Sequence, residues 1–140
     1  MAAVPAYSIF SASSELLVTA AVFYVLWRAY ARDDLRIGLL AVVLAFEAVV
    51  NIAYMAYRMA VPSEGLAGAP HWVTVTAALH GLLSLAMFLF LLLLAAMAYG
   101  EHKKGGNLFR EQPGLMWSFA ALWSLSVLSG EAIFVFAYLV

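Results

Sequence analysis

The stretch WVTVTAALHGLLSLAMFLFLLLLAAMAY, residues Trp72–Tyr99, decides the class of fold. It contains no Asp, Glu, Lys or Arg, and it exceeds the roughly 20 apolar residues that a helix needs to cross a bilayer core of about 30 Å. Three more segments are similarly long and apolar: 8–30, 37–60 and 115–139. The sequence therefore predicts an all-α integral membrane four-helix bundle, a single transmembrane domain over residues 1–140.

The composition supports this interpretation. The chain is 66% hydrophobic and 11% charged, whereas a soluble domain is closer to half apolar and a quarter charged. The formal net charge of −1 gives no basic surface for nucleic acid, which excludes that class of partner. The chain has no cysteine, which removes disulfides, thiolate nucleophiles and thiolate metal ligands. We therefore expect the lipid bilayer to be the main surroundings of the protein.

Basic residues predict how the chain is oriented. Six of the seven fall next to the first and third connections between the predicted helices: Arg28, Arg32, Arg36, Lys103, Lys104 and Arg110. Only Arg58 lies on the opposite side. Because Lys and Arg are enriched in cytoplasmic loops, we expect both connections in the cytoplasm and both termini outside.

Each predicted helix contains one ionisable residue well inside the apolar segment, namely Glu15, Glu47, His80 and Glu131. Such residues are costly in a membrane and are functional hypotheses by default. With a rise of about 1.5 Å per residue, Glu15, Asn51, His80 and Glu131 lie roughly 25–27 Å from the cytoplasmic connections, and Glu47 lies one turn lower. The sequence therefore predicts one polar layer in the outer half of the bundle.

Helical periodicity places other polar residues on the same faces. We expect these faces to point inwards, because lipid offers no hydrogen-bond partners. The four faces are Ser8, Ser11, Glu15 and Thr19; Glu47, Asn51, Tyr54 and Arg58; Thr76, His80, Ser84 and Met87; and Trp117, Ser124, Glu131 and Tyr138.

A metal or haem site is one hypothesis for this layer. Carboxylate and imidazole groups suit ions such as iron or copper, and helix bundles build such sites in their cores. The candidate metal ligands are Glu15, Glu47, His80 and Glu131. For a haem or another cofactor, His80 is the histidine that lies deep in a helix, and the candidate contacts are His80, Glu131, Asn51, Tyr54 and Arg58.

Two further hypotheses stay open. A glutamate inside a membrane can exchange a proton for a cationic substrate, and the position of Glu15 in the first of four helices is similar to that in small multidrug transporters. Alternatively, the polar residues only join the helices by hydrogen bonds in a purely structural membrane subunit.

Two short motifs carry a resemblance to a known family. His80 stands in ALHGLLSLAMF, and Trp123, Ser126, Ser129 and Gly130 stand in WSLSVLSGEAIFVFAY. These motifs resemble the small four-helix membrane proteins of the CtaM type, which are implicated in the maturation of haem-copper oxidases. The chain departs from that pattern at Arg58, where the family tends to have a histidine, and at Glu131, where an aliphatic residue is usual there. SSELL and LHG are also similar to elements of cytochrome oxidase subunit III.

The resemblance implies an accessory or assembly subunit of an aerobic respiratory complex of the haem-copper oxidase type. It would be a multi-pass protein of a prokaryotic plasma membrane, associated with other membrane subunits or with copies of itself. The polar layer would bind a metal, haem or quinone-like group. His80 would be its ligand or hydrogen-bond donor, the carboxyl groups would be ligands or proton acceptors, and Tyr54 and Arg58 would surround them. No catalytic residue is predicted, and we do not expect a self-sufficient enzyme.

Overall fold

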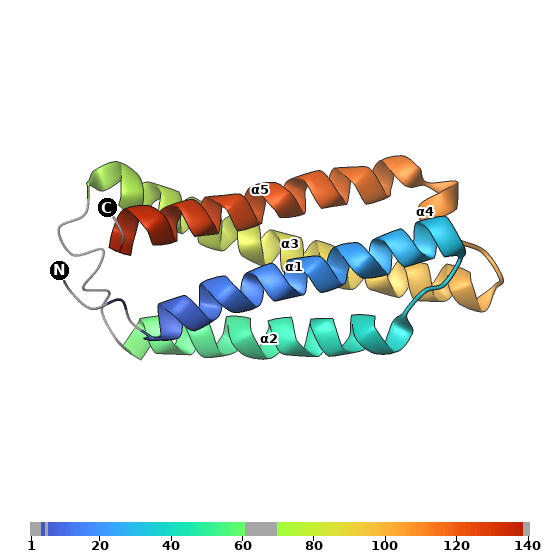
Figure 1. Cartoon of the computed structure of the whole chain (residues 1–140), viewed down its shortest axis with the longest axis horizontal. Helices are drawn as coiled ribbons and strands as arrows, with labels where there is room; N and C mark the ends of the chain where they lie inside the picture. The colour runs from blue at the N-terminus through green and yellow to red at the C-terminus, as the bar shows by residue number, and fades with distance from the viewer. Residues whose placement is uncertain (1–3, 5, 61–69, 139–140) are drawn as a thin grey trace.

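The computed structural model describes residues 4, 6–60 and 70–138, and their regular structure is helical. Four long helices lie alongside one another (Figure 1), and a short helix, α4, precedes the last of them. The bounds are α1 Ala6–Arg32, α2 Ile37–Ala60, α3 His71–Lys103, α4 Leu108–Glu111 and α5 Pro113–Tyr138. In this part of the chain, α1, α2, α3 and α5 are each long and apolar enough to cross a membrane. This confirms the predicted all-α four-helix membrane bundle.

The long helices form a ring in which each one contacts two neighbours. α1 lies against α2 and α5, and α3 lies against α5 and α2. The contact between α3 and α5 is the most extensive of the four, and the contact between α2 and α3 is the smallest. The bundle is therefore packed closely between α3 and α5 and loosely between α2 and α3.

The apolar core fills the half of the bundle nearest α4 and the α1–α2 turn. Phe119 is fully buried there, with its ring edge-on to Phe90 at 5.2 Å and tilted against Trp123 at 5.5 Å between ring centroids. Aliphatic side chains from the neighbouring helices complete the packing: Val22, Val25, Leu91, Leu94 and Met116.

The short helix α4 begins at Asn107, whose side chain caps it. The amide oxygen of Asn107 accepts hydrogen bonds from the backbone N–H groups of Phe109 at 3.1 Å and Arg110 at 3.2 Å. The carboxylate of Glu111 accepts from the N–H of Asn107 at 3.1 Å. These bonds satisfy N–H groups that the first turn of a helix otherwise leaves without partners.

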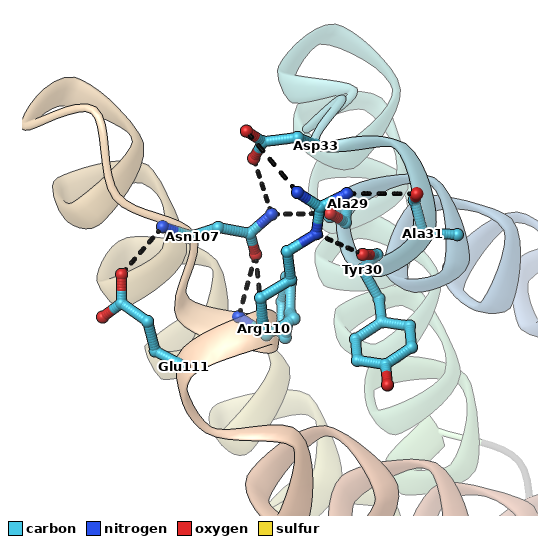
Figure 2. Close-up of polar contacts among 8 residues, drawn as sticks. Ala29, Tyr30, Ala31, Asp33, Asn107, Arg110 and Glu111 are labelled. Atoms are coloured by element: carbon cyan, nitrogen blue, oxygen red, sulfur yellow. Dashed lines mark hydrogen bonds and ion pairs between the residues drawn. The ribbon is translucent and has the colours of Figure 1, made fainter.

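Asn107 and Arg110 also bind the C-terminal end of α1 (Figure 2). The amide N–H groups of Asn107 donate to the carbonyl of Ala29 at 2.7 Å and to the carboxylate of Asp33 at 2.6 Å. Arg110 donates to the carbonyls of Tyr30 at 2.7 Å and Ala31 at 3.1 Å. We call this arrangement the clasp. It supplies donors to carbonyl groups that have no partner at the C-terminus of a helix.

A charged cluster fixes the turn from α1 to α2. Asp33 adopts a left-handed backbone with φ of 54°, which Asp tolerates better than most residues. The next residue, Asp34, accepts hydrogen bonds from the guanidinium of Arg28 and from Arg36 Nε at 2.8 Å. The hydrogen bond from Arg28, and secondarily the positive charges of Arg36 and Arg28, hold the pKa of Asp34 below its ordinary value.

The helices differ from the predicted segments mainly at the connections. α3 continues through Glu101 and His102 to Lys103, four residues beyond its predicted end, because a helix can extend past the apolar core into the interface. The sequence analysis does not predict α4, since a single turn has no hydrophobic period. Its signal in the sequence is Asn107, which follows two glycines and can cap a helix, and Glu111 four residues later. Most of the predicted loop after α2 lies outside the described residues.

Candidate functional site

A cavity of about 660 Å³ lies between the four long helices at the end of the bundle away from the clasp. Each of these helices contributes to its walls. Six of the seven predicted site residues line it: Glu15, Glu47, Asn51, Tyr54, His80 and Glu131. The seventh, Arg58, lies on α2, and its side chain is outside the described part of the structure. The predicted polar layer therefore surrounds one shared space.

The cavity borders directly on the apolar core, and three core residues form part of its wall. Met87, Trp123 and Val127 belong to the buried core and also line the cavity. The indole Nε1–H of Trp123 donates to Thr19 Oγ1 at 3.0 Å, which satisfies its polar atom and fixes the ring between α1 and α5. At the boundary between the two halves of the bundle, this hydrogen bond therefore joins α1 and α5.

His80 is held against α5 by a serine pair. Its Nδ1 lies 2.9 Å from Ser129 Oγ, and the hydroxyl of Ser129 donates to the carbonyl of Ser126 at 2.7 Å. Because a hydroxyl has only one hydrogen, its oxygen must accept at Nδ1, and Nδ1 carries the proton. The neutral ring then has its acceptor lone pair on Nε2.

Gly130 makes this placement of His80 sterically feasible. A Cβ at residue 130 would lie 2.7 Å from Cε1 and 3.0 Å from Nε2 of His80. The same position is 3.4 Å from Glu15 Oε2. An imidazole nitrogen from α3 and a carboxylate oxygen from α1 therefore converge on a bare stretch of α5 backbone, directly before Glu131.

The carboxyl groups occupy different walls. Glu15 on α1, Glu47 on α2 and Glu131 on α5 all line the cavity. The amide of Asn51 donates to the Glu47 carbonyl at 2.8 Å and to Glu47 Oε2 at 3.3 Å. Glu131 Oε1 is buried and has no hydrogen-bond partner among the described protein groups. An unsatisfied buried oxygen is costly, and in native structures it commonly marks a functional site.

The outer rim carries a group of tyrosines. The ring of Tyr7 on α1 stacks on Tyr54 at 5.9 Å and on Tyr57 at 5.1 Å between centroids. Tyr54 also lines the cavity. This stack joins the beginning of α1 to the end of α2, so the loosely packed end of α2 is still attached to the bundle.

The predicted inward face of α5 is wrong in part: Glu131 lines the cavity, and the side chain of Tyr138 lies outside the described residues, but Trp117 and Ser124 do not line it. On α5, the seven-residue series included Trp117, which is 56% exposed, and Ser124, whose hydroxyl donates to the carbonyl of Ala120 in its own helix. Drift is only about 20° per seven residues, so the error comes from rotation of the helix: Glu131 lies at the edge of the lining face, and Trp117 and Ser124 lie beyond it. The residues of α5 that line the cavity are Trp123, Ser126, Val127, Gly130, Glu131, Ile133 and Phe134. The spacing of three and four between Trp123, Ser126 and Gly130 was the available signal.

The cavity is lined by hydrogen-bond acceptors and by groups that can also donate, such as Asn51, Tyr54 and the serines. Its described lining residues provide three carboxyl groups, an imidazole with a free lone pair and several serine hydroxyls, and none of them is Lys or Arg. No three His, Asp or Glu residues of the described chain are placed to hold a metal ion together. The cavity has polar groups that can bind a small organic molecule with N–H or O–H groups.

No protein-family model, curated protein or solved structure matches the chain. None of these comparisons supports the expected likeness to the CtaM-type proteins or to oxidase subunit III.

Proposed function

We propose that this protein binds a lipid-soluble small molecule of the quinol type inside the membrane, as an accessory or assembly subunit of an aerobic respiratory complex. The observation that carries the binding function is the unsatisfied Glu131 Oε1 in a cavity that also contains Glu15 and His80 Nε2. The volume of about 660 Å³ lies within the range of small-molecule sites. The respiratory setting comes from the motif resemblance.

The two hydroxyl groups of a hydroquinone suit these residues. Each hydroxyl can donate a hydrogen bond, and Glu131 and His80 Nε2 can accept one each. Met87 and Trp123 form an apolar and aromatic floor for the ring. The matching of donors to otherwise unpaired acceptors is the main source of specificity in a buried site.

Direct binding tests this proposal. The purified protein in detergent micelles is titrated with decyl-benzohydroquinone by calorimetry. We expect saturable binding, and we expect Glu131→Leu to weaken it at least tenfold, about 1.4 kcal/mol. Glu101→Leu is the matched control, because Glu101 makes a surface ion pair with Lys104 at 3.0 Å and lies outside the cavity. Equal binding by both variants, or none by the wild type, contradicts the proposal.

The respiratory role needs a separate test. Removal of the gene from its host should lower terminal oxidase activity of the membranes, and the wild-type gene should restore it. If oxidase activity is unchanged, the assignment to a respiratory complex is wrong, whatever the outcome of the binding experiment.

Proton-coupled transport is the second candidate, and the observation that favours it is the presence of three carboxyl groups, those of Glu15, Glu47 and Glu131, in one cavity. A carrier of this kind would move a cation against a proton gradient in liposomes containing only this protein. Glu15→Gln would abolish that transport. If transport is undetectable with the wild type, the carrier function is excluded, and if Gln at all three carboxyl positions changes nothing, a structural role remains.

A further inference from the structure

The rim of the cavity is formed by two of the four helices. The lining residues on α1 and α5 are buried or half-buried, whereas the exposed ones belong to α2 and α3. On α2 they are Tyr54, Met55 and Met59, and on α3 they are Thr74, Ala78 and Gly81. A residue that both lines a cavity and is exposed marks its opening. The cavity therefore opens between α2 and α3, where the helix contact is smallest.

This opening reaches well down the side of the bundle. Gly81 lies ten residues after His71, the first residue of α3, which places it about 15 Å along the helix axis. A Cβ at residue 81 would meet no described atom within 4 Å. An opening at this depth in a membrane-spanning helix faces hydrocarbon, because the apolar core of a bilayer begins within a few residues of the helix end.

The polarity of the cavity changes from its inner wall to its opening. The inner wall carries His80 on α3, Glu15 on α1 and Glu131 on α5. At the opening, Tyr54 and Thr74 carry hydroxyl groups, whereas Met55, Met59, Ala78 and Gly81 offer no strong hydrogen-bonding group. A molecule that satisfies both regions has a hydrogen-bond donor at one end and an apolar chain at the other.

We propose that the opening between α2 and α3 is a lateral entrance from the bilayer. Through it, an amphiphile with a single apolar chain inserts its hydrogen-bond-donating head group towards Glu131 and His80. Its apolar chain lies along Met55, Ala78 and Gly81 and extends into the lipid. This inference rests on the proposed ligand-binding function, and it adds the route of entry and the requirement for a chain. Two head groups have the required chemistry, a neutral hydroquinone and a protonated primary amine.

The entrance is tested by filling it. Gly81→Leu adds a side chain where the described structure has open space, and Gly100→Leu on the same helix is the matched control, because a Cβ there also meets nothing within 4 Å and Gly100 lies far from the cavity. Both variants replace a helical glycine, so a general effect on α3 appears in both. We expect Gly81→Leu to weaken binding of decyl-benzohydroquinone or decylamine at least tenfold and Gly100→Leu to leave it unchanged.

The length of the apolar chain provides a second measurement on the wild type. We expect unsubstituted hydroquinone and methylamine to bind at least tenfold more weakly than the compounds with ten-carbon chains. Whichever decyl compound binds identifies the head group. If Gly81→Leu binds like Gly100→Leu, or if the compounds without chains bind equally well, the lateral entrance is wrong although the cavity still binds a ligand. If only decylamine binds the wild type, the quinol-type function fails although the entrance stands, and if neither decyl compound binds, both proposals fail.

Discussion

The two ends of the bundle differ in packing and in how far their polar groups are hydrogen-bonded. At the clasp, Asn107 and Arg110 supply donors to three carbonyl groups of α1, and Phe119 is fully buried in the adjoining core. At the other end, carboxyl groups from three helices surround a cavity and Glu131 Oε1 has no partner among the described groups. The same four helices are thus tightly packed at one end and polar and open at the other.

This difference teaches where stability and function reside. Satisfied hydrogen bonds and close packing stabilise a structure, whereas unsatisfied polar groups and cavities destabilise it and persist mainly where a ligand uses them. We therefore expect substitutions at the clasp end to change the stability of the protein, and substitutions at the cavity end to change its binding of ligand.

The largest effect on stability is expected from Phe119→Ala. Removal of this ring leaves a void beside Phe90 and Trp123, which should lower the free energy of unfolding by about 3–5 kcal/mol. Reversible unfolding in mixed micelles, followed by circular dichroism, measures the change. Leu122→Ala, an exposed position on the same helix, is the control and should cost far less; equal losses would mean that the core is not where the structure places it.

The next largest effect is expected at Gly130, and it concerns binding. Gly130→Ala would place a methyl group 2.7 Å from His80 Cε1, so the imidazole must leave Ser129. We expect a loss of roughly tenfold in affinity for decyl-benzohydroquinone, about 1.4 kcal/mol. Gly114→Ala, where a Cβ has open space, should bind like the wild type. Unchanged affinity of Gly130→Ala would show that the position of His80 is unimportant.

Asn107→Ala should have an effect of similar size to Gly130→Ala, but only on stability. It removes the cap of α4 and the hydrogen bond to Ala29, which together should cost about 1–2 kcal/mol. The same unfolding experiment measures it, with Lys104→Ala as a control, because that exposed side chain makes a surface ion pair worth little. If ligand affinity falls as much as stability, the two ends are not independent.

The smallest effect is the pH dependence at Asp34. Its pKa in the folded protein is below the ordinary value of 3.8, chiefly because Arg28 donates to its carboxylate. The resulting stabilisation is fully present above about pH 4 and is lost as the pH falls through the folded pKa. We expect the difference in unfolding midpoint between wild type and Asp34→Asn to be constant from pH 8 to 5 and to shrink below pH 4. A difference that persists at pH 2 contradicts this.

The sequence was sufficient for the fold and for most of the cavity wall. A run without charge such as Trp72–Tyr99 has one stable form in a bilayer, and a rise of 1.5 Å per residue placed Glu15, His80 and Glu131 at one level. All three line the cavity. Depth is predictable because it depends only on position along a straight helix.

Rotation of a helix about its axis was harder to predict. The sequence predicts that Trp117 and Ser124 of α5 face inwards. In the structure, Trp123, Ser126 and Gly130 line the cavity instead. Nothing in a nearly uniformly apolar helix fixes its rotation, which is decided by close packing against α3 and by the hydrogen bond from Trp123 to Thr19. The clasp was also unpredictable, since it joins side chains of α4 to carbonyl groups of α1 that are distant in sequence.

The most direct test of the central claim is to measure stability and binding on one variant, Glu131→Leu. The claim is that Glu131 serves a ligand and does not hold the bundle together. We predict that the free energy of unfolding without ligand is equal to or higher than that of the wild type, because a buried oxygen without a partner has been removed. Binding of decyl-benzohydroquinone should be lost. A protein destabilised as much as Phe119→Ala, with unchanged affinity for the hydroquinone, would contradict the account.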